Sequence, residues 1–381
     1  MSLAGRSFCS AVFASAMAVV VLTPSAQAQT FNILHSFTGP DGAYPVANGL
    51  ELEAGKLYGT TPNGGDADAG VVFQLSSKGK ETVLYSFTGG SDGANPNGGV
   101  VHDPATGDIY GTAAGGGDSG NGVLFRLGAD GTYTVLHSFT GSDGQGPIGS
   151  LLRDELGNLY GVAYGGGGSG SGTVFELTAG GTLNILHEFN GSDGSGPSAT
   201  LNRDSAGNLY GVTQFGGDGG FGIVFKVAPD GTFTTLHSFT GESDGANPQG
   251  GLARDENGNL YGTATYGANG KGTVFRLKPN GKFKVLYAFL GEDDGEYPQG
   301  DLLRIKSGML FGTTSYGGRL KNGTAYRLSQ NGSLLLLHSF GGGFNDGAYP
   351  HAGLIKGKHG AYYGIAHSGG GGAGIVYSLT K

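Results

Sequence analysis

A short aromatic motif, Leu-His-Ser-Phe or a close variant of it, occurs seven times along this 381-residue chain. The phenylalanines that end its copies are separated by 50, 52, 50, 50, 50 and 51 residues, and they are Phe37, Phe87, Phe139, Phe189, Phe239, Phe289 and Phe340. A period of this size indicates a repeat fold, most naturally a propeller with one blade per repeat. Residues that recur in every blade build the blade, so a functional site is to be sought where one repeat departs from the others.

Each repeat contains four short segments rich in β-branched and aromatic residues, separated by Gly, Asn, Asp or Pro. In the fifth repeat these segments are Pro248–Asp255, Asn259–Thr263, Gly272–Leu277 and Phe283–Phe289. Such runs are typical of β-strands, and four strands in about 50 residues form one antiparallel blade. We therefore predict an all-β fold, a seven-bladed β-propeller with four antiparallel strands per blade.

The turns between the third and fourth strands are marked by an Asn-Gly or Asp-Gly pair. These pairs are Asp130-Gly131, Asp230-Gly231, Asn280-Gly281 and Asn331-Gly332. Because both residues of such a pair tolerate positive φ angles, the pairs predict tight hairpins with primed turns.

The two ends of the chain are complementary. Residues 31–37 form a lone fourth strand, and the last repeat stops after a third strand at residues 374–379. If the N-terminal strand completes the last blade, all seven blades have four strands and no sheet edge is left unpaired. We therefore predict that the ring closes in this way.

Residues 1–28 have the features of a secretory signal peptide, with Arg6, an apolar run and an Ala-Gln-Ala cleavage site. Residues 29–381 are then expected to form a single propeller domain, exported to the periplasm or beyond the cell, monomeric and without a transmembrane segment. The only cysteine, Cys9, lies in the leader, so we expect neither disulfides nor a cysteine metal site. Loss of Arg6 takes the net charge from −8 to −9, which argues against nucleic acid as a partner.

Two polar positions recur in the repeats. The links between blades all contain an Asp-Gly pair, at Asp41, Asp92, Asp143, Asp193, Asp244, Asp294 and Asp346. These carboxylates could form a cation or sugar site, but the favoured interpretation is that each one binds the backbone of its own turn. Histidines at a second position, His35, His137, His187, His237 and His338, are replaced by Tyr85 and Tyr287 in two repeats, which indicates packing within the blade.

Three residues of the last two repeats depart from their counterparts, and they are the candidate catalytic residues. His351 lies where other repeats have Asn97, Gln249 and Gln299, which are themselves candidate ligand-binding residues at the mouth of the central channel. His367 and Asp301 also replace other residue types. Imidazoles near a carboxylate could transfer protons or bind a divalent ion. The spacing resembles no zinc motif, so we expect no metal and no cofactor.

Four aromatic residues stand in the glycine-rich loops between the second and third strands: Tyr164, Phe215, Tyr266 and Tyr316. Their rings could stack on the faces of sugars, or they could plug each loop onto its own blade. We treat them as candidate ligand-binding residues.

The repeat unit Gly-Gly-Leu-x-Arg-Asp-x-x-Gly-Asn-Leu-Tyr-Gly-Thr, followed by Gly-Thr-Val-Phe-x-Leu and Val-Leu-His-Ser-Phe-Thr-Gly, resembles the bacterial tandem repeat called GloVer. The resemblance covers nearly all of the chain after the leader and implies an exported bacterial protein. Members of the family often end in a surface anchor, whereas this sequence ends Leu379-Thr380-Lys381 without an apolar tail. The strand plan is also similar to that of NHL and streptogramin-lyase propellers, although a shared fold transfers no chemistry.

The leading hypothesis is therefore an exported, non-catalytic module that binds a glycan or a protein through its longer loops. One alternative is a lyase or hydrolase with His351, His367 and Asp301 around the channel mouth. The other is a structural protein of the cell envelope that displays its loops.

Overall fold

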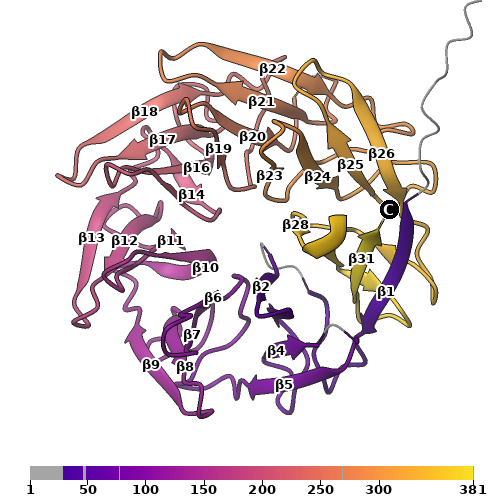
Figure 1. Cartoon of the computed structure of the whole chain (residues 1–381). Coiled ribbons are helices and arrows are strands. Elements are labelled where there is room, and N and C mark those ends of the chain that lie inside the picture. The colour runs from indigo at the N-terminus through magenta and orange to yellow at the C-terminus, as the bar shows by residue number, and fades with distance from the viewer. Residues whose placement is uncertain (1–28, 46–48, 77, 268, 381) are drawn as a thin grey trace, which may run out of the picture.

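Seven small β-sheets surround a central axis in the computed structural model, one after another in chain order (Figure 1). The structure describes residues 29–45, 49–76, 78–267 and 269–380. The predicted signal peptide and Cys9 lie outside the described residues. Each sheet forms one blade, so the predicted seven-bladed, all-β propeller is confirmed.

The strands follow the predicted order, from the axis outwards in each of the first six blades. They are β2 Glu51–Glu53, β3 Lys56–Thr61, β4 Val71–Leu75 and β5 Glu81–Ser86; β6 Val101–His102, β7 Ile109–Ala113, β8 Val123–Leu127 and β9 Tyr133–Ser138; β10 Gln145–Arg153, β11 Leu159–Gly165, β12 Thr173–Leu177 and β13 Leu183–Glu188; β14 Ser195–Pro197 with β15 Asn202–Arg203, β16 Leu209–Phe215, β17 Ile223–Val227 and β18 Phe233–Ser238; β19 Ala253–Arg254, β20 Leu260–Ala264, β21 Thr273–Leu277 and β22 Phe283–Ala288; β23 Leu303–Arg304, β24 Leu310–Thr314, β25 Thr324–Leu328 and β26 Leu334–Ser339. In the fourth blade the innermost strand is interrupted, and both of its pieces pair with β16.

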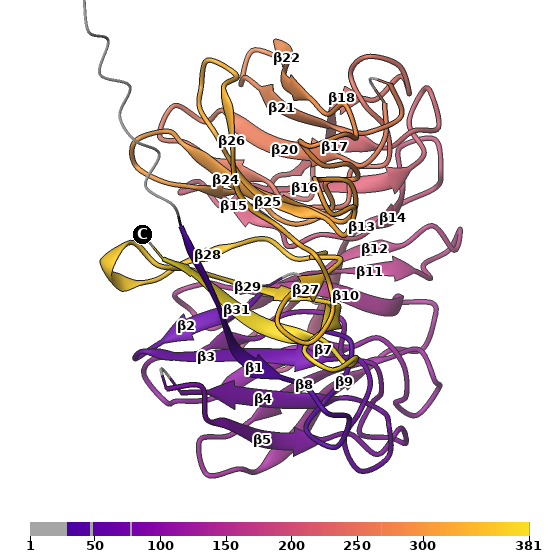
Figure 2. The same ribbon diagram turned by 90° about the vertical axis from the view of Figure 1, so that its right-hand side faces the viewer.

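The last blade contains both ends of the described chain. Its strands are β28 Ile355–Lys356, β29 Tyr362–Ala366, β31 Ile375–Thr380 and, outermost, β1 Thr30–Ser36. Strand β1 pairs antiparallel with β31, with Phe31 opposite Leu379 and Ile33 opposite Tyr377, and Figure 2 shows the indigo β1 lying along the yellow β31. The predicted closure of the ring is confirmed. A two-stranded ribbon of β27 Gly347–Ala348 and β30 Ser368–Gly369 and a 3₁₀ turn, η1 Lys358–Gly360, complete the described elements.

Glycine in the second strand and an aromatic ring in the third form the centre of each blade. A Cβ atom on Gly161 would lie 2.6 Å from Cζ of the fully buried Phe175, so only glycine leaves room for the ring. The same contact occurs in all seven blades, between Gly59 and Phe73, Gly111 and Phe125, Gly161 and Phe175, Gly211 and Phe225, Gly262 and Phe275, Gly312 and Tyr326, and Gly364 and Tyr377. The recurrent Tyr-Gly-Thr motif is therefore a packing motif.

Hairpins between third and fourth strands differ in type from the prediction. Gly131 has a φ of 86°, whereas Asp130 is not among the residues with positive φ. Gly131 donates its N–H to the Gly128 carbonyl at 2.8 Å, and the Asp130 carboxylate accepts the N–H of Thr132 at 2.9 Å. This is a type I turn followed by a glycine bulge, so the prediction of primed turns was wrong. Asp130 stabilises the turn through its side chain, without adopting a left-handed backbone.

The links between blades have the same geometry in every repeat. The residue before the link proline has a φ between 51° and 64°, and its N–H donates to a loop carbonyl of the preceding blade at 2.7–3.0 Å. These residues are Tyr44, Asn95, Gly146, Gly196, Asn247, Tyr297 and Tyr349. The proline then packs on the glycine that opens the third strand of the preceding blade; at Gly172, a Cβ atom would meet Cδ of Pro197 at 2.5 Å.

The link aspartates serve this geometry. In each repeat one carboxylate oxygen contacts the His or Tyr of the preceding aromatic motif. The tyrosine hydroxyls donate to it at 2.9 Å, and the Nε2 atoms of the histidines lie 2.9–3.1 Å from it. In the third repeat the other oxygen of Asp143 accepts the N–H of Thr140 at 2.8 Å. The interpretation of these residues as turn-forming is confirmed, and we call each His/Tyr–Asp pair a latch.

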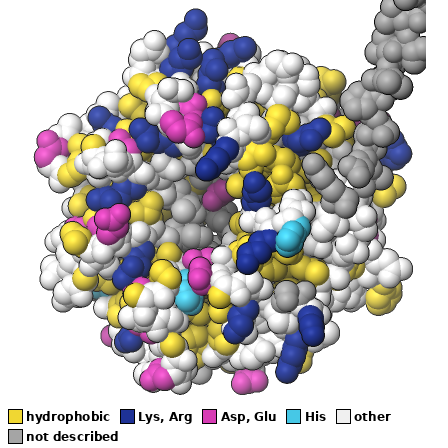
Figure 3. All heavy atoms as spheres, in the orientation of Figure 1, with side chains coloured by type: hydrophobic (Ala, Val, Ile, Leu, Met, Phe, Trp, Pro, Cys, Tyr) yellow, Lys and Arg dark blue, Asp and Glu magenta, His cyan; other side chains and the backbone are white. Residues whose placement is uncertain are grey.

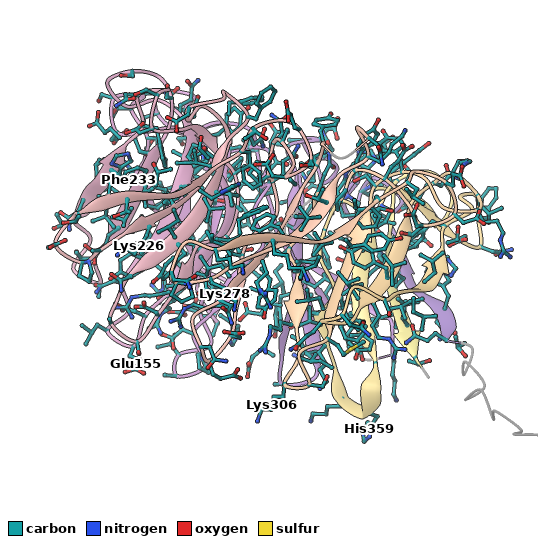
Figure 4. All side chains as sticks on the ribbon, turned by 90° about the horizontal axis from the view of Figure 1, so that it is seen from above. Glu155, Lys226, Phe233, Lys278, Lys306 and His359 are labelled. Carbon is teal, nitrogen blue, oxygen red and sulfur yellow. The ribbon has the colours of Figure 1, made fainter. Side chains whose placement is uncertain are left out.

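The ring has two different faces. The loop face carries the links and the long loops between second and third strands, and the turn face carries the remaining turns. In the edge-on view of Figure 4, Glu155, Lys306 and His359 mark the turn face along the lower edge. Figure 3 looks onto the turn face, where basic and acidic side chains are interspersed around the ring. The candidate residues at the link prolines and in the long loops belong to the opposite, loop face.

Replacing Gly161 by alanine tests the packing of glycine on the aromatic ring. Gly161 does not have a positive φ, so the substitution adds only a methyl group that overlaps Phe175. We expect a loss of about 2 kcal/mol in the free energy of unfolding, measured by urea denaturation, because overpacking a core costs roughly 1–3 kcal/mol. Gly180→Ala is the matched control, since the nearest atom to its added Cβ is 3.8 Å away. Equal losses in the two variants would contradict this account.

Candidate functional site

A cavity of about 340 Å³ opens on the loop face. Its wall is formed largely by one repeat position, the residue that follows each link proline: Asn97, Ile148, Ser198, Gln249, Gln299 and His351. Gly149, Gln214 and His367 complete the lining. The corresponding residue of the first blade, Val46, lies outside the described residues. Because every link has the same backbone geometry, the fold brings these side chains together around the channel mouth.

His351 is held by two polar neighbours. Its Nδ1 lies 2.8 Å from Oε1 of Gln299 and 3.1 Å from Oγ of Ser315, and the Ser315 hydroxyl donates to the same amide oxygen at 2.9 Å. We assign the proton of the neutral ring to Nδ1, because an amide oxygen accepts but cannot donate. Burial, and secondarily repulsion by His367, lowers the pKa of His351 to about 4. The ring is therefore neutral at physiological pH.

His367 lies beside His351 in the cavity wall. The two ring centroids are 5.6 Å apart with the planes nearly perpendicular, and Tyr44 stacks on the other side of His367 at 5.2 Å. The backbone N–H of His367 donates to the carbonyl of Tyr349 at 3.2 Å, which ties this loop to the link of its own blade. Burial lowers the pKa of His367 as well. The structure thus brings together the two histidines that the sequence singled out.

Asp301 is placed differently, since it is not among the described residues that line this cavity. Its Oδ1 accepts the N–H of Gly251 at 2.5 Å, and Thr200 also hydrogen-bonds the carboxylate. Burial raises the pKa of Asp301 to about 6, although these two hydrogen bonds act in the opposite direction. The innermost position of the ring is otherwise occupied by small residues, namely Gly49, Gly99, Ser150, Thr200, Gly251 and Gly353. Asp301 therefore bridges neighbouring blades near the axis.

Aromatic rings follow one another along the loop face over the fifth, sixth and seventh blades. Tyr297 makes edge contacts with Tyr266 at 5.3 Å and with Tyr316 at 5.8 Å, and Tyr316 lies 5.0 Å from Tyr349. Tyr266 and Tyr316 are 45% and 42% exposed, so much of each ring faces solvent. We call Tyr266, Tyr297, Tyr316 and Tyr349 the aromatic arc.

The other two predicted rings lie over the third and fourth blades. Tyr164 and Phe215 are 40% and 44% exposed. Both rings border Gly196: a Cβ atom there would lie 3.0 Å from the Tyr164 ring and 3.5 Å from the Phe215 ring. They form a second exposed aromatic pair on the same face.

Several residues of the site were not identified from the sequence. Ile148, Ser198 and Gln214 line the cavity, Ser315 contacts His351, and Tyr44, Tyr297 and Tyr349 supply rings. A signal existed for the three tyrosines, because all of them directly precede a link proline. Aligning the seven links position by position would have found them together with Ile148 and Ser198.

Comparison with known families supports the repeat assignment. The model of the Gloeobacter/Verrucomicrobia repeat matches residues 14–205 and 157–377. The chain belongs to this family. A comparison with curated protein sequences gives no match for this Gloeobacter/Verrucomicrobia repeat protein.

Solved structures with the same fold include an extracellular domain and a candidate lactonase. The extracellular domain of a candidate hybrid two-component system, BT3049 from B. thetaiotaomicron, is 12% identical with a TM-score of 0.59, over 92% of this chain and 41% of that one. A candidate 6-phosphogluconolactonase from Bacteroides fragilis is 18% identical with a TM-score of 0.55, over 82% of this chain and 87% of that one. At these identities the likeness shows the fold alone. Within the described part of the chain, no helix is both long and apolar enough to span a membrane.

The depressed pKa of His351 predicts a specific loss of stability in acid. As pH falls from about 6.5 to about 4, the unfolded chain takes up a proton on this histidine while the folded chain does not, so folding becomes less favourable. The expected contribution is about 3 kcal/mol by pH 4, at roughly 1.4 kcal/mol per pH unit. His351→Gln, which introduces the residue of the neighbouring blades, should remove it. Urea denaturation of both proteins between pH 4 and pH 7 measures the difference, and parallel pH profiles would refute the assignment.

Proposed function

We propose that this protein is an exported, non-catalytic module that binds a neutral oligosaccharide on its loop face. The observation that carries the proposal is the position of the aromatic arc next to a cavity lined by amides, a hydroxyl and neutral imidazoles. Binding sites for small molecules combine apolar or aromatic walls with a few polar groups that fix orientation. The loop face has both components.

The chemistry of the lining favours a sugar over a charged ligand. None of the described residues lining the cavity is a Lys, Arg, Asp or Glu, and burial keeps His351 uncharged at neutral pH. Asn97, Gln214, Gln249 and Gln299 offer both donors and acceptors, as sugar hydroxyls require. Tyrosine rings present flat apolar surface with little conformational freedom to lose, which suits the C–H faces of pyranose rings. A bound oligosaccharide would place one residue in the cavity and others along the arc.

Export is part of the proposal. The apolar leader with its Ala-Gln-Ala site supports it, and so does the likeness to extracellular propeller domains. We propose that residues 29–381 act outside the cytoplasm as one monomeric domain.

A hydrolase is the second candidate, favoured by the contact between the Ser315 hydroxyl and His351. Three features argue against it. The Nδ1 atom nearest to Ser315 carries the proton in our assignment, so it cannot accept the serine proton, and a pKa of about 4 makes the ring a weak base. Asp301 moreover hydrogen-bonds Gly251, so it is not placed to orient either imidazole. The cavity is better suited to hold a ligand than to cleave it.

Removing a single ring of the aromatic arc tests whether the ligand binds by stacking on these tyrosines. We expect Tyr316→Ala to weaken binding to an oligosaccharide found by glycan-array screening about tenfold or more, since removing a central aromatic anchor typically costs 1–2 kcal/mol. Tyr316→Phe keeps the ring and should bind nearly as tightly as the parent. Isothermal titration calorimetry measures both affinities.

The control is Leu156→Ala, which removes an apolar side chain that is 79% exposed on the turn face. Its affinity should match that of the parent protein. Binding unaffected by Tyr316→Ala would exclude the arc from the site. If the protein bound no glycan but did bind a protein, the proposal would be rejected in favour of a protein partner. Turnover of a lactone or glycan that His351→Gln abolishes would reject it in favour of a hydrolase.

A further inference from the structure

One blade interface departs from the other six, and it is the interface between the last blade, which contains both ends of the described chain, and the first blade. The outer strands of neighbouring blades meet in a seam, where a latch residue of one blade faces a residue at the start of the next outer strand. In four of the other six seams two rings stack: Tyr85 on Tyr133 at 3.9 Å, His187 on Phe233 at 3.8 Å, His237 on Phe283 at 3.9 Å, and His338 on Phe31 at 4.1 Å. The other two seams have a leucine at this position, Leu183 or Leu334. Phe233, on β18, is labelled in Figure 4.

The seam between β1 of the last blade and β5 of the first blade contains a carboxylate instead. We call it the closing seam. The residue of β5 in this seam is Glu81, and the corresponding residues of the other six outer strands are Tyr133, Leu183, Phe233, Phe283, Leu334 and Phe31. The latch that Glu81 faces is His35 with Asp41, whose Nε2 and Oδ2 are 3.0 Å apart. One ligand atom from each of His35, Asp41 and Glu81 lies within 4.8 Å of the others.

One oxygen of the Glu81 carboxylate has no hydrogen-bond partner among the described residues. This atom, Oε1, is also shielded from solvent. Buried carboxylates are usually paired with a cation or with hydrogen-bond donors. A carboxylate facing a second carboxylate and an imidazole lacks only a positive charge.

We propose that His35, Asp41 and Glu81 form a divalent transition-metal site, most suited to Zn²⁺, that fastens the closing seam. Zinc binds imidazole nitrogen and carboxylate oxygen at about 2.0–2.2 Å in a tetrahedron, which places ligand atoms about 3.3 Å apart. The separation of His35 and Asp41 already fits that value, and a small rotation of Glu81 brings in the third ligand. The fourth position is left for water.

The donor atoms of the latch remain compatible with this role. The Oδ1 atom of Asp41 accepts the N–H and the hydroxyl of Thr38, at 2.7 Å and 2.9 Å, as in the turn of an ordinary link. The Oδ2 atom of Asp41 and Nε2 of His35 lie 3.0 Å apart, so a metal would take the place of the proton between them, with the proton of the neutral ring on Nδ1. The metal would join β1, which belongs to the last blade, to β5 of the first. It would thus reinforce the contact between the last blade and the first, which the chain already links covalently after β1, independently of any ligand on the loop face.

Thermal unfolding of the EDTA-treated protein with and without added Zn²⁺ tests the site. A metal that binds only the folded state raises the Tm in proportion to the logarithm of its concentration above the dissociation constant. We expect a rise of several degrees in the parent protein and no rise in Glu81→Phe or Glu81→Leu. These variants introduce residues that the sister strands already tolerate at this position, so they should fold. Calorimetry should show one zinc per chain that depends on Glu81.

Two further variants remove ambiguity. His351→Gln eliminates the imidazole pair of the loop-face cavity as a rival zinc ligand, and the Tm rise should persist in it. Leu183→Glu places a carboxylate at the equivalent position next to the His137–Asp143 latch, and it should add a second zinc site. No Tm rise in the parent protein, or an equal rise in Glu81→Phe, would overturn the proposal. Failure of oligosaccharide binding would leave this result unaffected.

Discussion

The structure depends on one contact repeated between neighbouring blades, the seating of a link proline on a glycine of the preceding blade. The residue before the proline adopts a left-handed backbone and donates its N–H to the preceding loop, so each link is fixed in position and direction. Glycine is required under the proline ring because a Cβ atom would overlap it, as at Gly172 and Pro197. The left-handed conformation costs about 1–2 kcal/mol at a residue such as Tyr297, and the interblade hydrogen bond offsets part of that cost.

This contact also explains how a repeat protein can acquire a site. The backbone after each proline is fixed, and its side chain points to the channel mouth whatever its type, so Asn97, Gln249 and His351 can differ without altering the blade. The residue before the proline is similarly free provided that it tolerates positive φ, and there Tyr297 and Tyr349 supply rings in place of Asn or Gly. Variation is therefore possible at the positions that face the axis and the loop face.

The sequence predicted the number of blades, the strand order and the closure by β1, because those follow from a regular period and from turn residues. It did not predict the turn type at Asp130, since Asp-Gly suits both a primed turn and a type I turn with a bulge. It also did not predict that Asp301 would hydrogen-bond Gly251 while His351 contacts Gln299. Asp301 lies two residues after the position that Gln299 and His351 share, and there the chain has turned from the channel mouth towards the neighbouring blade. Contacts between blades, such as Glu81 with His35, depend on blade rotation and not on sequence spacing.

Among the described carboxyl and imidazole groups, Glu51, Glu81, Asp301 and His351 have the largest pKa shifts. Burial lowers the pKa of His351 to about 4 and raises those of Asp301 and Glu81 to about 6 and 7. Each of these three replaces a residue type that the sister blades place there without such a cost: Gln or Asn, a small residue, and an aromatic or leucine. Asp301 and His351 lie in the sixth and seventh blades, and Glu81 lies in the seam between the last blade and the first. Stability is lowered on one side of an otherwise regular ring, which is the side where the loop-face ligand and the seam metal are proposed to bind and to restore it.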